Sequence, residues 1–160
     1  MTEKKSLKVR TSKKSEKIDP ENFNKLVAHA RLSRLRLMSS SFDLKPDAMG
    51  ESRRNWAYRI SASLEDWSLD CDALELRGIF AFKVACVEGR RHPVSLGARY
   101  FATYRLSAEC DEKAALSYLD RVARFSCYPY FRALFSILTE QSGLQLPPLP
   151  VMKEPPRLVR

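Results

Sequence analysis

The residues best suited to chemistry in this chain of 160 residues are two histidines and four cysteines. His29 and His92 could act as general bases or zinc ligands, but neither has a neighbour in sequence that marks it for such a role. The cysteines are spaced without any Cys-x-x-Cys pair: Cys71, Cys86, Cys110 and Cys127. Since free cysteine is usually buried and a zinc site needs paired ligands, the sequence predicts reduced, buried thiols.

A run of alternating carboxylates, Asp66, Asp70 and Asp72, could attract a cation. Carboxylates that alternate along an exposed strand are more often simply solvated. The five glycines are scattered and form no phosphate-binding loop, and no nucleophile elbow is present. We therefore expect no enzymatic activity, no cofactor and no metal.

The net charge of +9 is concentrated near the N-terminus, because residues 1–17 contain seven basic and two acidic residues. A segment with many like charges and few apolar side chains cannot offset the entropy of ordering. We expect residues 1–18 to form a disordered basic tail that aids solubility. Binding of nucleic acid by this tail, together with Arg99 and Arg105, is the alternative interpretation.

The composition, with 44% hydrophobic residues, is sufficient for one folded domain. We place that domain at residues 19–152 and a proline-broken basic tail at residues 153–160. No run approaches the roughly 20 apolar residues of a membrane span, and the N-terminus lacks the apolar core of a secretory signal. The cytoplasm is the expected location, without insertion into a membrane.

Three successive segments alternate apolar and polar residues with the period of two that is typical of strands: residues 56–71, 74–86 and 94–106. In the first segment the alternation changes phase near Glu65, which predicts a β-bulge. An edge strand is expected over residues 34–44, with Leu35, Leu37 and Phe42 inward. Alternation of this kind favours antiparallel strands with one face covered.

Helical patterns flank the strands. Asp19 and Pro20 begin a short helix, and Asp111 begins another over residues 112–127. Since proline suits the first turn of a helix, Pro129 predicts a new helix from about residue 128, which Gly143 ends. Strands followed by helices indicate an α+β domain rather than a parallel sheet.

The C-terminal third of the sequence contains an ordered set of motifs that is similar to a known family. Tyr128-Pro129-Tyr130-Phe131-Arg132, an amphipathic helix, Gly143 and the segment Leu-Pro-Pro-Leu-Pro at residues 146–150 resemble the SecB family of export chaperones. With the order of strands, the resemblance extends over residues 33–152. It implies a SecB-like fold, in which helices pack on one face of a four-stranded antiparallel sheet, and self-association into dimers or tetramers. It also implies binding of non-native proteins in apolar grooves.

The resemblance also suggests which residues bind. Apolar residues in segments whose burial is least assured are the candidates for the client-binding groove: Phe42, Trp67, Leu69, Leu144, Leu146, Leu149 and Val151. Three residues of the helix at 112–127 are the candidates for the oligomer interface: Leu116, Leu119 and Val122. Core packing is the alternative role for both sets. We expect Arg132 to bind carbonyl groups or an acid near the helix junction.

This sequence differs from the SecB family in two features, and both affect the function that the resemblance implies. Pro155-Pro156 excludes the second amphipathic helix with which family members end. The family's export members dock on the SecA motor through an acidic sheet surface, whereas the solvent-facing positions here include Arg77, Lys83, Arg99 and Arg105. The resemblance therefore implies a chaperone that serves either protein export, with SecA as partner, or a dedicated client such as an antitoxin.

Overall fold

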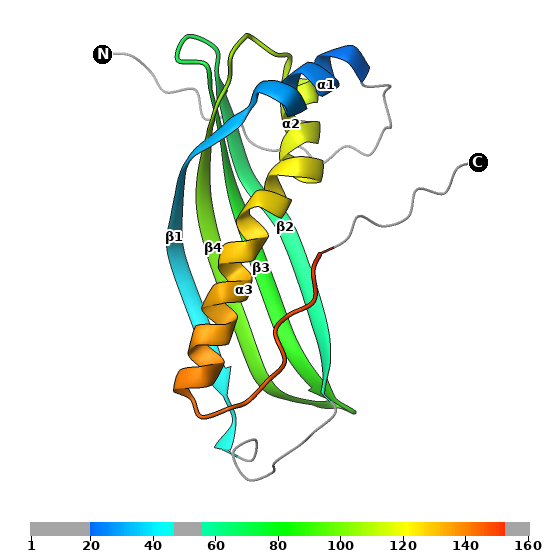
Figure 1. Ribbon diagram of the computed structural model, residues 1–160, viewed down its shortest axis with the longest axis vertical. Helices are drawn as coiled ribbons and strands as arrows, with labels where there is room; N and C mark the ends of the chain where they lie inside the picture. The colour runs from blue at the N-terminus through cyan, green and yellow to red at the C-terminus, as the bar shows by residue number, and fades with distance from the viewer. Residues whose placement is uncertain (1–19, 47–55, 153–160) are drawn as a thin grey trace, which may run out of the picture.

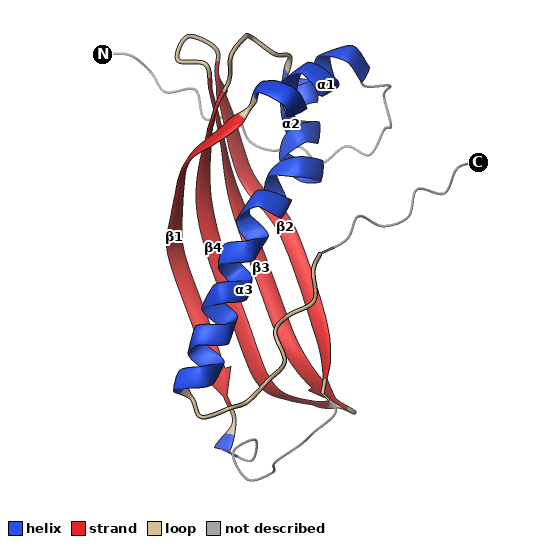
Figure 2. Cartoon of the chain, viewed as in Figure 1, coloured by secondary structure: helices blue, strands red, loops and turns tan. Residues whose placement is uncertain are grey.

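The computed structural model describes residues 20–46 and 56–152, and its centre is a long antiparallel sheet with helices on one face (Figures 1 and 2). The strands are β1 (Arg31–Leu44), β2 (Ala57–Asp70), β3 (Glu75–Glu88) and β4 (Arg91–Arg105), in the order β1-β4-β3-β2. This arrangement confirms the predicted α+β fold. The expected tails at residues 1–18 and 153–160, and the Asp19 cap, lie outside the described residues.

Strand β2 contains the predicted bulge. Its pairing with β3 shifts register between Leu64 and Asp66, where the apolar alternation changes phase. Glu65 at the bulge accepts a hydrogen bond of 2.6 Å from Nε of Arg99 in β4. The bulge keeps Trp67 on the same face as Leu64, so both ends of β2 present apolar side chains to the helices.

Strand β1 pairs only with β4 and is an edge of the sheet. Leu35 and Phe42 are partly buried on the helix-bearing face, as expected. Leu37 is paired with Tyr100 and so belongs to the same face, yet it is 47% exposed. The prediction that Leu37 packs inward is therefore wrong as to burial, because the helix crosses the sheet diagonally and leaves the middle of β1 uncovered (Figure 1).

The predicted helix break at Pro129 is absent. Helix α2 (Glu112–Tyr118) continues through a π-helical turn, η2 (Leu119–Ala123), into α3 (Arg124–Gln141), with Pro129 inside α3. At the π-helical junction the carbonyl of Ala123 accepts hydrogen bonds from the hydroxyls of Tyr104, at 3.1 Å, and Ser126, at 2.7 Å. The wider turn ends six residues before Pro129, and the helix continues through the proline.

Both predicted ends of this helical rod are confirmed. Oδ1 of Asp111 accepts a hydrogen bond of 2.6 Å from the amide of Ala114, as an N-cap does. Gly143, with φ of 75°, ends α3. The amide of Gly143 donates to the carbonyl of Glu140, and the amide of Leu144 donates to the carbonyl of Thr139. This is a Schellman motif, and it directs the following chain back along the sheet.

The short helix α1 (Pro20–His29) packs beside α2 and buries Leu26. The main core lies between α3 and the sheet, where the ring of Phe131 stacks on Phe82 with centroids 5.4 Å apart. Phe135 meets the edge of Tyr58 at 5.9 Å. The rod thus crosses the sheet toward the end of β2 at which Tyr58 lies.

Glycine at position 78 permits the closest approach of the π-helical turn to the sheet. A Cβ atom added there would lie 3.0 Å from the ring of Phe80 and 3.3 Å from Cδ2 of Leu119. Leu119 itself is fully buried. The expectation that Leu119 contributes to an oligomer interface is therefore corrected, since its side chain belongs to the core of the subunit.

Candidate polypeptide-binding surface

The chain after α3 runs back in an extended form beside β2 (Figure 1). Three side chains hold its carbonyl groups. Nε of Arg132 donates to Leu149 at 2.8 Å, and the hydroxyls of Tyr128 and Tyr58 donate to Pro150 and Pro147, each at 2.7 Å. Residues of α3 and β2 therefore fix this segment from two sides. Arg132 therefore binds a carbonyl, as expected, but that carbonyl belongs to the extended segment and not to a helix junction.

The apolar residues of the extended segment differ in exposure. Leu149 is fully buried against the core, so the expectation that it lines an open groove is corrected. Leu144 and Leu146 are partly buried, and Val151 is 66% exposed. Leu149 therefore anchors the segment, while the other three residues are accessible to a ligand.

Trp67 and Leu69 lie on the helix-bearing face of β2 and are partly buried. The strand register aligns Trp67 across the sheet with three residues of the other strands: Gly78, Ala102 and Leu35. Phe42 instead belongs to the row of Leu96, Val84 and Ile60, at the opposite edge. The structure therefore does not bring Phe42 together with Trp67 and Leu69.

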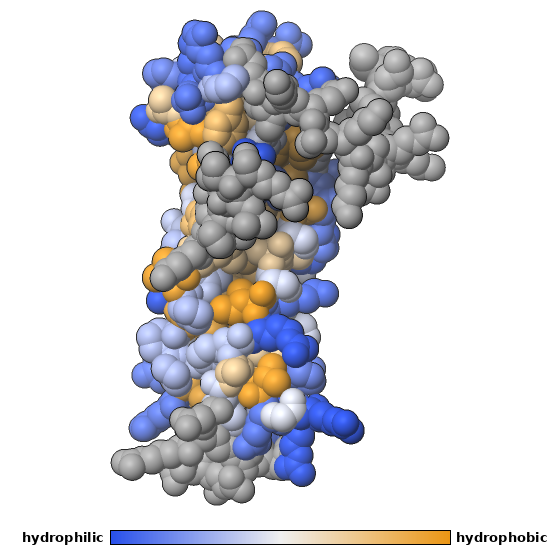
Figure 3. All heavy atoms as spheres, turned by 90° about the vertical axis from the view of Figure 1, so that its right-hand side faces the viewer, coloured by the Kyte–Doolittle hydropathy of each residue, from blue (hydrophilic) through white to orange (hydrophobic). Residues whose placement is uncertain are grey.

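The face of Trp67 also includes three large, partly buried residues of β2: Tyr58, Ile60 and Leu64. Together with Trp67, Leu69, Leu144, Leu146 and Val151 they form what we call the β2-edge surface. Figure 3 shows apolar groups exposed along this side of the molecule. The alternation of residues 56–64 indicated their face, but their accessibility depends on β2 being an edge strand, which alternation does not show.

A second set of exposed apolar side chains lies on the helical rod. Leu116 is 42% exposed and Val122 is partly buried, as an interface role would require. The sequence analysis missed Tyr130, at 54%, and Ile137, at 52%. The seven-residue spacing of Tyr130 and Ile137 places both side chains on one face of α3. This face differs from the one that carries the buried Phe131, so the spacing could have indicated their exposure.

Burial also affects the ionisable groups near the β2-edge surface. It raises the pKa of the Tyr58 phenol to about 12 and that of the Cys86 thiol to about 11. Burial thus disfavours the charged form of each group. Cys86 and Cys127 are buried as expected, whereas Cys71 is exposed and Cys110 is only partly buried, which corrects the expectation for these two residues.

No three His, Cys, Asp or Glu side chains within residues 20–46 and 56–152 lie close enough together to hold a metal ion. None of the helices in that part of the chain combines the length and the hydropathy of a membrane span.

Comparisons with known proteins bear on the fold. No family model matches the sequence, and no curated protein matches it. Among solved structures, the Mycobacterium tuberculosis SecB-like chaperone Rv1957, in complex with a ChAD peptide from the HigA1 antitoxin Rv1956, superposes with a TM-score of 0.67. The match has 17% sequence identity and covers 84% of this chain and 99% of that chain.

A protein of unknown function from Streptococcus agalactiae also matches, with a TM-score of 0.42 and 13% identity, over 78% of this chain and 96% of that chain. The mycobacterial match extends over most of both chains and agrees with the observed sheet and helix order. This chain therefore has the SecB-like fold.

Proposed function

We propose that this protein is a molecular chaperone that binds unfolded or non-native polypeptides on the β2-edge surface. The observation that carries the proposal is the extent of the SecB-like fold, which covers 84% of the chain. The second support is local, because accessible apolar side chains line an edge strand of the sheet.

The physical match is between this surface and an unfolded chain. Such a chain exposes apolar side chains together with free amide and carbonyl groups. Among the residues that the structure describes, no strand pairs with the outer edge of β2, and the side chains of Trp67, Leu69 and Leu146 lie on the adjacent face. A client could add a strand at the edge and place apolar residues over the face. This recognises extended conformation and hydrophobicity rather than one sequence.

We propose that the protein serves a narrow range of clients. The similar mycobacterial chaperone holds a peptide from an antitoxin. The exposed residues of the outer sheet face here include Lys83, Arg99 and Arg105, so an acidic docking face of the kind used with SecA is not expected. A dedicated client such as an antitoxin is therefore favoured over general protein export.

Self-association is part of the same proposal. Leu116, Tyr130 and Ile137 are exposed on the helical rod, and Leu37 and Met38 are 47% and 49% exposed on β1. Exposed apolar side chains of this size can contribute to a surface that binds a protein. We propose that they form contacts between copies of the chain in a dimer or tetramer.

The function is tested by adding the protein to a model client that aggregates when its disulfides are reduced, in buffer of moderate ionic strength. Suppression of light scattering at a few molar equivalents is the expected result. Apolar capture is insensitive to salt, whereas binding to nucleic acid weakens steeply as salt is added. Tight, salt-sensitive binding of an oligonucleotide without protection of the client would refute the proposal and favour the alternative function.

A further inference from the structure

A group of arginines lies on the face of the sheet that the helices leave uncovered. The register aligns Arg34, Thr103 and Arg77 in one row across β1, β4 and β3. Arg31, Arg105 and Glu75 form the row on one side of it, and Arg36, Phe101 and Ile79 form the row on the other. The alternation of three neighbouring strands thus collects guanidinium groups at one end of this outer face.

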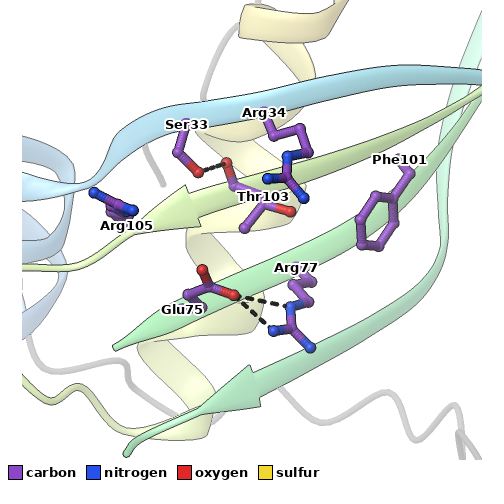
Figure 4. A pocket seen from close by; sticks show the side chains of 7 residues that line it. All are labelled: Ser33, Arg34, Glu75, Arg77, Phe101, Thr103 and Arg105. Atoms are coloured by element: carbon purple, nitrogen blue, oxygen red, sulfur yellow. Dashed lines mark hydrogen bonds and ion pairs between the residues drawn. The ribbon is translucent and has the colours of Figure 1, made fainter. Parts of the chain in front are cut away.

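These side chains surround a hollow of about 420 Å³. Its lining is formed by Ser33, Arg34, Glu75, Arg77, Phe101, Thr103 and Arg105 (Figure 4). Ser33 lies at a register shift of β1, and its hydroxyl donates a hydrogen bond of 3.0 Å to the carbonyl of Thr103. Thr103 is only 6% exposed although it faces away from the helices, so long neighbouring side chains cover it. The hollow has the size of a site for a few side chains.

The charge of the hollow is unbalanced. Its lining has three guanidinium groups and one carboxylate. That carboxylate, of Glu75, is paired with Arg77 at 2.6 Å. Arg34 and Arg105 have no ion-pair partner among the residues that the structure describes. Guanidinium groups match carboxylates and phosphates through two parallel hydrogen bonds, so two such positions are vacant for an anionic ligand.

The surroundings favour an acidic polypeptide over nucleic acid. Phe101 and Ile79 are partly exposed and provide an apolar floor beside the arginines. Asp66 and Asp70 continue the same face on β2 and would repel a long polyphosphate backbone that crossed the sheet. A peptide can place carboxylates on the arginines and an apolar side chain on Phe101 within a few residues.

The segments of this sequence outside the described residues do not supply an acidic ligand. Residues 1–19 and 153–160 contain more basic than acidic residues, and residues 47–55 contain equal numbers, so they do not complement the arginines. We propose that the hollow at Arg34, Arg77 and Arg105 binds an acidic segment of a partner protein, with carboxylates on the guanidinium groups and an apolar residue on Phe101. This docking site is on the face of the sheet opposite the helices and is separate from the β2-edge surface.

Fluorescence anisotropy with a labelled, end-blocked peptide of alternating Glu and Leu tests the proposal against the same peptide carrying Gln in place of Glu. We expect the acidic peptide to bind more tightly than its neutral counterpart and to weaken as salt is added. The double substitution Arg34→Gln with Arg105→Gln should reduce the affinity at least about fivefold, the effect of losing two partly exposed charge pairs.

The matched control is Arg59→Gln with Arg121→Gln, which removes the same charge from exposed positions outside the hollow. Equal loss of affinity in the control pair would overturn the proposal, as would equal binding of the acidic and neutral peptides. Binding of oligothymidylate that is tighter than that of the peptide and equally sensitive to Arg34 and Arg105 would overturn the assignment to a protein. Aggregation of the model client should be suppressed equally by all variants, so this proposal and the chaperone proposal fail independently.

Discussion

Nε of Arg132 in α3 donates a hydrogen bond of 2.8 Å to the backbone carbonyl of Leu149, seventeen residues further along the chain. The buried side chain of Leu149 and this bond together hold the extended segment against α3. Because Pro148 and Pro150 have no amide hydrogen, the carbonyls of this segment are its main points of attachment. The position of three of the eight residues of the β2-edge surface therefore depends on a residue of the helix.

Substitution of Arg132 by methionine keeps the alkyl chain and removes the donor. We expect the free energy of unfolding to fall by about 1–2 kcal/mol, because the carbonyl of Leu149 loses a charged partner. The amides of Leu149 and Val151 should exchange faster with deuterium. Arg121→Met, at an exposed position of η2, is the control and should change neither quantity. Unchanged exchange in Arg132→Met would show that Leu149 and the hydroxyls of Tyr58 and Tyr128 hold the segment without Arg132.

Two strand glycines give a paired test of helix packing. Gly78→Ala should destabilise the protein by about 1–3 kcal/mol, because the added methyl group lies against Phe80 and Leu119. Gly97, in the neighbouring strand, has no atom within 4 Å of an added Cβ. Gly97→Ala should therefore leave the midpoint of urea unfolding unchanged or raise it slightly. Equal effects of the two substitutions would argue against the close approach of η2 to the sheet.

Stability should decline in alkaline solution. Burial raises the pKa of Cys86 from 9.0 to about 11, so between these values the unfolded chain loses the thiol proton while the folded chain keeps it. The contribution of this thiol to the free energy of unfolding is complete below pH 9 and is lost as the pH rises through about 11. Tyr58 and Tyr100, with pKa values raised to about 12, act in the same direction.

The measurement is urea unfolding at intervals above pH 8, compared with Cys86→Ala, in which the free energy of unfolding should decline less steeply with pH.

The burial of the cysteines also predicts the thiol reactivity of the native protein. Cys71 should react rapidly with a disulfide reagent, whereas Cys86 and Cys127 should react only as the protein unfolds. Rapid modification of Cys86 at neutral pH would contradict its assignment to the core.

A charge placed on the β2-edge surface should weaken the proposed chaperone activity. Val151→Asp adds a carboxylate at a 66% exposed position and costs little in folding, but it opposes apolar contact with a client. We expect several-fold more protein to be needed for half-maximal suppression of aggregation. Val27→Asp, on the 39% exposed residue of α1, is the matched control and should protect the client normally. If both variants protect equally, the client binds elsewhere.

The proposed association of copies through α3 predicts a change in mass. Ile137→Asp should shift the protein toward the monomer in light scattering, since a 52% exposed apolar residue becomes charged. Ser136→Asp introduces the same charge at the adjacent exposed position, on a different side of the helix, and should retain the mass of the parent protein. A parent protein that is monomeric at micromolar concentration would refute this part of the proposal.

Local features of the fold were predictable from the sequence. The phase change at Glu65 gave the β-bulge, and Asp111 and Gly143 gave the two ends of the helical rod. Each of these depends on a few neighbouring residues, because alternation, capping and left-handed backbone conformation are properties of short stretches of chain. The fold class followed from the order in which these stretches occur.

The surroundings and burial of individual side chains were decided only by contacts between residues that are distant in the sequence. Pro129 has the same chemistry at a helix start and within α3, so its type alone does not distinguish the two positions. Leu149 and Val151 are both aliphatic residues of the same extended segment, yet Leu149 is fully buried and Val151 is 66% exposed. Their difference arises because the extended segment meets α3 and β2, and an apolar side chain is covered only where another element packs on it.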